Sequence, residues 1–398
     1  MTTTPPGAWR ALGVATVAFL MLFWAWGLVA PLAPDYRDLL GLSPVQVAVL
    51  VALPVLLGSL ARIPLGAVTD RYGGRRVFTA LSLAVVVPLL FLAVVGSYPL
   101  LLVGAFFLGV SGASFAVGVP FVTAWFPPAR RGTALGIYGI GTAGTAIAAF
   151  TGPPIVAATS RSSLFLLVAG VMAATAAMLW TVARDAPDWR PQTLPLAARL
   201  RAALGLRITL DLAVLYAVTF GGFVAFGAYL PTYLQETYAL ATADAAARTG
   251  GFIVLAVLAR PVGGLLSDRY AAPRVLVVGL GVVAVGALLL ALSLSLVTAT
   301  GVFLAVAVAL GLGSGAVFAL VGRRAPAASV GTVTGFVGAA GGLGGFVPPL
   351  VMGAVFQTTG SFLIGWLLLA LVAAGGLAYT RQRFRPEAAT VAGLDGHR

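Results

Sequence analysis

The stretch LARIPLGAVTDRY at residues 60–72 recurs as LARPVGGLLSDRY at residues 258–270, at an offset of 198 residues. Both copies place an arginine inside a long apolar segment, Arg62 in the first copy and Arg260 in the second. No aspartate or glutamate lies deep in any apolar segment of the chain. The recurrence predicts two related halves, each of which carries one cation in its interior.

The composition is typical of an integral membrane protein. Hydrophobic residues make up 60% of the 398 residues, charged residues 9%, and the mean hydropathy is +1.04, whereas soluble domains have about 25% charged residues. The apolar runs are longer than the ~10 residues of a membrane-spanning barrel strand. We therefore expect an all-α fold.

Twelve apolar stretches reach or approach the ~20 residues that a helix needs to cross a bilayer. The first is too long for a cleaved signal peptide, and we interpret it as a retained span. The twelve predicted spans are residues 9–33, 43–69, 76–95, 99–125, 131–156, 162–183, 208–235, 249–267, 273–294, 298–321, 328–356 and 361–380.

The longest polar connection, residues 184–207, follows the sixth predicted span. Within it, residues 196–204 have the pattern of a short amphipathic helix at the membrane surface. This connection divides the chain into a six-helix bundle at 1–183, a linker at 184–207, and a second bundle with a basic tail at 208–398. Parallel repeats of six spans are a transporter design, with cargo bound at the midplane between the halves.

The loop arginines predict the orientation. With the N-terminus in the cytoplasm, 19 of the 24 basic residues lie on the cytoplasmic side and only Arg37, Arg161 and Arg248 lie outside. Positive charge concentrates in cytoplasmic loops of membrane proteins. We therefore expect both termini in the cytoplasm and the protein in the inner (cytoplasmic) membrane.

The chain lacks the residues that several classes of function require. The chain has no cysteine, and its single histidine is His397. The acidic residues lie in loops or at helix ends, so no nucleophile, metal site or general base lies within the membrane. The net charge of +13 is explained by loop arginines. We expect no enzyme activity, no catalytic residue, no metal, no cofactor, no nucleic acid partner, and a monomer.

Both deep arginines are predicted near the middle of the bilayer. Each stands eight residues before the aspartate of its copy, about 12 Å of helix, and half the hydrocarbon core is about 15 Å. A charge there costs roughly 2.5–3.5 kcal/mol. Each side chain could instead bend to the interface and be structural. The paired arrangement favours a shared anion, because the planar guanidinium fork suits a small flat oxyanion.

The loop after the second span, GAVTDRYGGRR at 66–76, resembles the loop signature of the major facilitator superfamily, and 264–274 (GLLSDRYAAPR) is a degenerate copy. This resemblance implies twelve helices in two pseudo-symmetric bundles. A narrower resemblance is to the nitrate/nitrite porter (NarK-like) family, which has one arginine in span two and one in span eight. Its glycine-rich segments match 335–348 (GFVGAAGGLGGFVP) well and 136–144 (GIYGIGTAG) in part.

The resemblance implies a set of substrate-binding residues. They are Arg62, Arg260, Phe115, Tyr216, Phe220, Thr142, Gly139, Gly338 and Gly342. The family usually has asparagine where this chain has Thr142, which leaves the hydrogen bonding of the anion open. The glycines could serve helix packing alone, and the aromatics could be core or lipid-facing filler. In the functional interpretation the glycines let backbone approach the anion and the helices bend, and the aromatics form dry walls, with the Tyr216 hydroxyl as a donor.

Charged residues at the predicted cytoplasmic helix ends form a second candidate group, which we expect to act in gating. They are Asp70, Arg71, Arg131, Asp268 and Arg269. These residues could only set the topology, or they could form a network that holds the cytoplasmic gate shut in the outward-facing state.

The sequence therefore predicts a secondary transporter that moves nitrate and/or nitrite, its small inorganic anion partner, across the lipid bilayer by alternating access. Anion binding would neutralise the repulsion between the arginines and let the halves close. The lack of a deep carboxylate favours nitrate–nitrite exchange over proton coupling. Proton-coupled nitrate symport, and a porter for another small anion or an organic compound, remain alternatives. A channel would show flux far above carrier turnover.

Overall fold

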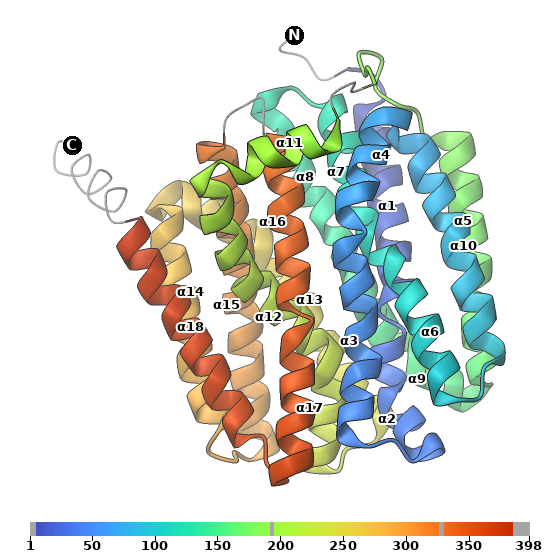
Figure 1. The fold of residues 1–398 in the computed structure, drawn as a ribbon, viewed down its shortest axis with the longest axis vertical. Helices are drawn as coiled ribbons and strands as arrows, with labels where there is room; N and C mark the ends of the chain where they lie inside the picture. The colour runs from blue at the N-terminus through green and yellow to red at the C-terminus, as the bar shows by residue number, and fades with distance from the viewer. Residues whose placement is uncertain (1–4, 192–194, 326–329, 385–398) are drawn as a thin grey trace.

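The computed structural model describes residues 5–191, 195–325 and 330–384, and the predicted basic tail beyond residue 384 lies outside them. Within these ranges the chain forms α-helices and two short 3₁₀ helices, with no strand. The helices run side by side, and α1 begins at the same end of the bundle at which α18 stops (Figure 1). We call this end the terminal face and the opposite end the far face.

The helices fall into two series, joined by one short helix. The first series is α1 (Ala8–Trp26), α2 (Val29–Leu40), α3 (Pro44–Leu60), α4 (Arg62–Tyr72), α5 (Gly74–Val94), α6 (Tyr98–Leu108), η1 (Gly109–Ala113), α7 (Ser114–Trp125), α8 (Pro128–Gly139), η2 (Ile140–Ala143), α9 (Gly144–Ala158) and α10 (Arg161–Val182). The joining helix is α11 (Leu196–Leu204). The second series is α12 (Arg207–Tyr238), α13 (Thr242–Tyr270), α14 (Ala272–Leu290), α15 (Leu296–Arg324), α16 (Val330–Gly344), α17 (Val347–Thr359) and α18 (Leu363–Arg383).

Twelve helical spans of the described chain are long and apolar enough to cross a membrane. This confirms the predicted fold class and number of spans, and the protein is a multi-pass membrane protein. The bounds differ in places: the eighth span is Thr242–Tyr270, longer at both ends than the predicted 249–267. The division into domains at residues 183 and 207 stays a prediction.

Five of the described spans are interrupted along their length, which the sequence analysis did not anticipate. Three breaks have a proline four residues further on, and proline lacks the N–H that would bond to the carbonyl at the break. These pairs of break and proline are Gly27 and Pro31, Leu60 and Pro64, and Gly344 and Pro348. The other two breaks are the 3₁₀ turns η1, which contains two glycines, and η2, which contains one and is flanked by Gly139 and Gly144.

These breaks lie where the predicted binding residues are. The break after α3 makes Arg62 the first residue of α4, and η2 carries Thr142. Backbone that departs from the α-helix at membrane depth is tolerated only where it is buried in protein or lines a cavity. The breaks therefore mark the middle of the bundle as the place to look for a site.

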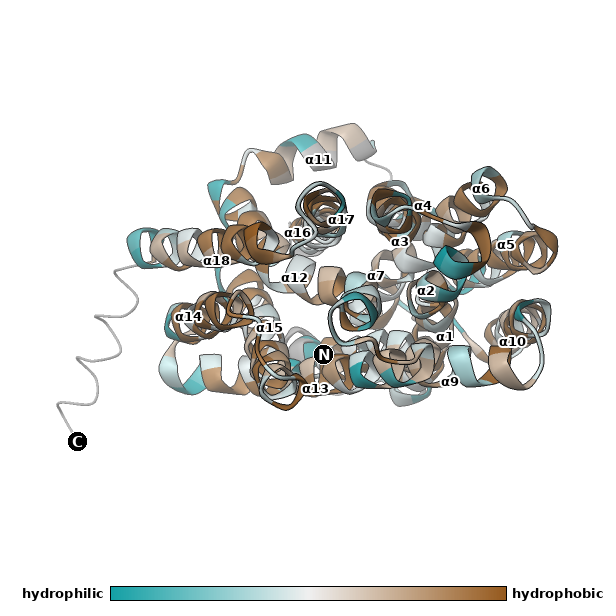
Figure 2. Cartoon of the chain, turned by 90° about the horizontal axis from the view of Figure 1, so that it is seen from below, coloured by the Kyte–Doolittle hydropathy of each residue, from teal (hydrophilic) through white to brown (hydrophobic). Residues whose placement is uncertain are grey.

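The two series pack against each other as two bundles. Helix α3 contacts α16 and α17, α9 contacts α13, and α2 contacts α12. Seen along the bundle, α1–α10 and α12–α18 form two groups side by side, with apolar ribbon on many of the outer helices (Figure 2). Helix α11 crosses the terminal face beside α16 (Figure 1), where the predicted amphipathic segment lies.

Candidate functional site

Arg62 lies at the contact between the two bundles. The residue is 3% exposed. Its Nε donates to the carbonyl of Gly112 in η1 at 3.3 Å, and its Nη1 donates to the carbonyl of Gly338 in α16 of the other bundle. The guanidinium is therefore held inside the protein and does not bend to the membrane surface.

Arg260, on α13, is its counterpart from the second bundle. Its Nη1 donates to the Thr142 hydroxyl in the first bundle at 3.1 Å. Its Nε and Nη2 are buried and have no hydrogen-bond partner among the described residues. Unsatisfied buried donors are rare and costly, more so when they carry charge. Among the described residues, these two donors are the strongest indication of a ligand.

The two arginines share one aromatic neighbour. The guanidinium carbon of Arg62 lies 5.6 Å from the centre of the Phe220 ring, and that of Arg260 lies 4.9 Å from the same ring. Phe223 lies 4.5 Å from Arg260, and Phe115 lies 5.8 Å from Arg62. Cations within about 6 Å of a ring centre are attracted to its face. The rings therefore line a site that is cationic and poor in water.

The predicted aromatic residues are brought together here with two that were missed, Phe223 and Phe318. Tyr216 stacks on Phe220 with ring centres 4.8 Å apart. Phe318 of α15 lies 4.9 Å from Tyr216 and 6.0 Å from Phe115, so it connects the rings of the two bundles. Phe223 could have been found, since it lies three residues after Phe220 on the same helix face. No signal in the sequence marks Phe318.

The glycines of α16 leave room for side chains of the central cluster, and their predicted approach to the anion stays a prediction. A methyl group at Gly342 would collide with the Ser59 hydroxyl and lie 3.2 Å from Arg62 Nη1. A methyl group at Gly338 would lie 3.3 Å from the Phe115 ring. Gly341, which was not among the predicted residues, leaves room for the rings of Tyr216 and Phe220.

Gly139 contributes in a different way. Nothing lies within 4 Å of the position that a methyl group would take there, so no close approach requires glycine. Its carbonyl accepts a hydrogen bond from the Thr142 hydroxyl at 2.9 Å. Because that bond uses the proton of the Thr142 hydroxyl, the hydroxyl oxygen is oriented to accept a hydrogen bond from Arg260.

The hydroxyl of Thr142 yields a testable prediction. We expect Thr142→Val to raise the KM for the transported anion by about tenfold, because a hydrogen bond to a charged group contributes about 1.5–3 kcal/mol and Arg260 would lose its one described partner. Thr142→Ser keeps the hydroxyl and is the matched control. An unchanged KM in Thr142→Val would show that this contact does not matter for binding.

No described ion pair links Arg62 or Arg260 to a carboxylate. The described residues also contain no group of three or more His, Cys, Asp or Glu side chains that could hold a metal. The well-buried Asp211 is the fifth residue of α12 and accepts hydrogen bonds from Arg383 at 2.8 Å and from Tyr379 at 2.6 Å. The positive charge of the central site thus has no protein counter-charge in the described chain.

The predicted gating residues lie at the terminal-face ends of their helices. Asp268 pairs with Arg323 at 2.6 Å, within the second bundle. Arg131 Nε donates to the Phe126 carbonyl at 3.1 Å, within the first bundle. Arg71 and Arg269 lie over the neighbouring Tyr72 and Tyr270 rings, at 5.5 and 5.3 Å. These contacts stay within one bundle, and the gating role stays a prediction.

The role of Asp70 can be tested directly. We expect Asp70→Asn to reduce transport several-fold while leaving the amount of protein in the membrane unchanged, because the closed gate would lose charge attraction of about 1 kcal/mol. Asp244→Asn, in the i,i+4 pair with Arg248 on the far face, is the control. Unaltered flux in Asp70→Asn would reject the gating role.

Two six-span bundles with two buried arginines at their contact are typical of a membrane transporter of the major facilitator type, and the chain belongs to that superfamily. It matches the Major Facilitator Superfamily over residues 15–349 and again over 243–394. It is 47% identical to the probable nitrate/nitrite transporter NarK2 of Mycobacterium tuberculosis (strain ATCC 25618 / H37Rv), with 93% of this chain and 95% of that protein covered.

Two further relatives have related descriptions. The nitrite extrusion protein of Bacillus subtilis (strain 168) is 35% identical, with 91% of each chain covered. The probable nitrate transporter NarT of Staphylococcus carnosus (strain TM300) is 37% identical, with 90% of this chain and 92% of that protein covered. These matches confirm the resemblance to the nitrate/nitrite porter family.

The fold is also found in solved structures. A bacterial homolog of the human lysosomal transporter Spinster, in an inward-facing and occupied conformation, has a TM-score of 0.69 and 16% identity. The match covers 96% of this chain and 98% of that one. At this identity the likeness shows the fold alone.

Proposed function

We propose that this protein exchanges nitrate and nitrite across the cytoplasmic membrane by alternating access, without chemical change to either ion. The family supplies the substrate class, since three relatives are described as nitrate or nitrite transporters. The observation that carries the proposal is the pair of unpartnered Arg260 donors, Nε and Nη2, beside the ring that Arg62 also faces. A planar anion with several acceptor oxygens suits these donors.

The bound anion would act as the link between the bundles. Arg62 belongs to the first bundle and Arg260 to the second, and each already reaches a partner in the opposite bundle. An anion between them would reduce their mutual repulsion and favour the closed arrangement, because a ligand shifts an equilibrium toward the state that it binds better. One anion entering as another leaves is electrically neutral, so exchange would need no proton.

The proposed orientation places the terminal face in the cytoplasm and the far face outside. It is supported by the concentration of arginines in the loops of the terminal face. The proposed functional unit is a monomer, because both arginines of the site belong to one chain.

An assay in liposomes tests the function. Purified protein is reconstituted with nitrite inside, and nitrate entry is followed with and without a pH gradient, against liposomes without protein. The proposal predicts nitrate entry that requires internal nitrite and not the gradient. Entry only with the gradient would indicate proton symport, entry without internal nitrite would indicate a uniporter or channel, and no entry would reject the substrate.

A further inference from the structure

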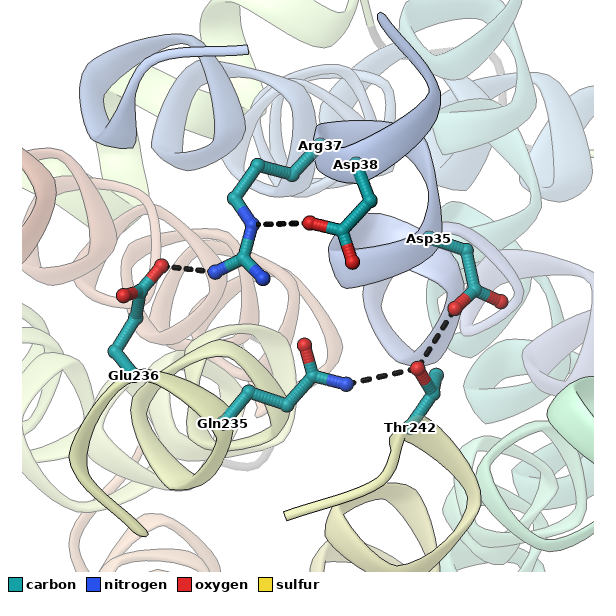
Figure 3. A network of polar contacts seen from close by, with 6 residues as sticks. All are labelled: Asp35, Arg37, Asp38, Gln235, Glu236 and Thr242. Carbon is teal, nitrogen blue, oxygen red and sulfur yellow. Dashed lines mark hydrogen bonds and ion pairs between the residues drawn. The ribbon is translucent and has the colours of Figure 1, made fainter. Parts of the chain in front are cut away.

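A second polar network lies at the far face, where α2 is found in Figure 1, and Figure 3 shows its six residues from close by. Arg37, near the end of α2, donates from Nε to Asp38 at 2.9 Å and pairs through Nη1 with Glu236 of α12. The two partners of Arg37 belong to different bundles. The pair with Glu236 therefore ties the first bundle to the second.

A hydrogen-bonded chain makes a second tie beside it. The Thr242 hydroxyl, at the start of α13, donates to Asp35 at 2.7 Å and accepts from the Gln235 amide at 2.7 Å (Figure 3). Asp35 lies on α2, whereas Gln235 and Thr242 belong to the second bundle. We call these six residues, Asp35, Arg37, Asp38, Gln235, Glu236 and Thr242, the far-face network.

The other edge of the same face is also closed. The backbone N–H of Val45 in α3 donates to the side-chain carbonyl of Gln357 in α17 at 3.2 Å. Gly353 of α17 packs so closely on α3 that a methyl group there would collide with Ala48. The far face is thus sealed by contacts between α2 and α12–α13 and between α3 and α17.

A small cavity lies between the bundles near the arginine site. Its volume is about 40 Å³, and its lining includes Val51, Thr145 and Phe223. Phe223 also contacts Arg260. A cavity of this size holds a few waters at most, so an anion has room to pass here only when the bundles separate.

The side chains of the far-face network differ in solvent exposure, and the difference indicates which contact breaks when the bundles separate. The side chains of Arg37 and Glu236 are 24% and 20% exposed, whereas that of Asp38 is 68% exposed. Asp38 is on the same helix as Arg37 and would stay beside it when the bundles part. Glu236 would move away with α12 and be hydrated.

We propose that the Arg37–Glu236 pair is the lock of the far-face gate, and that Asp38 holds Arg37 in the open state. Closing the gate shields the pair from water and strengthens it, and opening it transfers Arg37 from two carboxylates to one. This role rests on the proposal that the protein alternates between two states. It assigns transport functions to residues that the sequence analysis treated as loop or helix-end charges.

The chain contains no cysteine, so a single introduced cysteine is the only thiol that can be labelled. Its labelling rate then measures how accessible that position is. Val51→Cys places a thiol in the wall of the small cavity between the bundles, where Val51 is buried, and a membrane-impermeant maleimide is applied to right-side-out vesicles. Ser97→Cys, exposed on the far face, is the reference for accessibility, protein amount and orientation. We expect slow labelling of Val51→Cys and fast labelling of Ser97→Cys.

Glu236→Gln is expected to speed the labelling of Val51→Cys at least about fivefold, the factor that 1 kcal/mol produces. Asp38→Asn is expected to slow the labelling of Val51→Cys. Arg37 would still have Glu236 as a partner in the closed state, but it would have no carboxylate partner in the open state. The exchange of charges, Arg37→Glu with Glu236→Arg, should return slow labelling. Asp244→Asn, whose pair with Arg248 stays within one bundle, should have no effect.

Unchanged labelling in Glu236→Gln, with normal labelling of Ser97→Cys, would overturn the lock. Labelling that stays fast in the charge-exchanged variant would overturn the claim that this pair is the cause, and unchanged labelling in Asp38→Asn would overturn the role of Asp38. The assay uses no nitrate. The gate can therefore fail while the transport proposal holds, and a failed transport assay leaves the labelling result intact.

Discussion

Arg62→Lys and Arg260→Lys are each expected to reduce nitrate–nitrite exchange by about 100-fold, with protein amount in the membrane unchanged. Lysine keeps the charge but loses the planar fork. In Arg62 the fork connects the Gly112 carbonyl of one bundle to the Gly338 carbonyl of the other. Loss of one or two charge-assisted hydrogen bonds costs about 1.5–3 kcal/mol each, and about 2.7 kcal/mol corresponds to the expected factor.

The measurement is the initial rate of exchange in liposomes, with Arg248→Lys as the control. Arg248 lies near the far face and bonds to Asp244 and Thr300, away from the central site. We expect the control to keep most of its activity. Near-normal exchange in both central variants would show that charge alone is enough and that the guanidinium geometry is not used.

Gly342→Ala is expected to reduce exchange by at least about tenfold. The added methyl group would collide with the Ser59 hydroxyl and crowd Arg62 Nη1, which would have to move from its bond with Gly338. Inserting one carbon into a well-packed interior typically costs 1–3 kcal/mol. The readouts are exchange rate and the amount of folded protein in the membrane.

The same helix supplies the control for this variant. Nothing lies within 4 Å of a methyl group at Gly335, so Gly335→Ala should be close to wild type. Adding Ser59→Ala to Gly342→Ala removes the colliding hydroxyl and should restore part of the activity. If Gly342→Ala alone transports normally, α16 does not need a glycine at this position.

Much of the fold could be predicted because its signals are local. Length and hydropathy are enough to count the spans, and the repeated arginine segments indicate two related bundles with Arg62 and Arg260 at their middle. The breaks within spans were missed, because a proline in an apolar segment can follow a break or lie inside a continuous helix. Pro64 follows a break, whereas Pro54, Pro231 and Pro261 lie inside continuous helices.

The hydrogen-bond partners of the site residues depend on how the two bundles pack against each other, and no local sequence pattern predicts that packing. Arg62 donates to two backbone carbonyls. Every residue has such a carbonyl, so the residue types in the sequence do not identify these partners. Arg37 and Glu236 are 199 residues apart, and each was judged only by its place at a helix end or in a loop. The family resemblance supplied Phe115, Tyr216 and Phe220, but Phe318 completes their contacts from a helix with no matching motif.

An experimental structure of the protein with bound nitrate would test the central claim most directly. We predict density for one planar anion between the bundles, with oxygens at 2.7–3.2 Å, the ordinary hydrogen-bond range, from guanidinium nitrogens of both Arg62 and Arg260. The unpartnered Nε and Nη2 of Arg260 should be among its donors. An anion bound elsewhere, or one that contacts only one of the two arginines, would contradict the account.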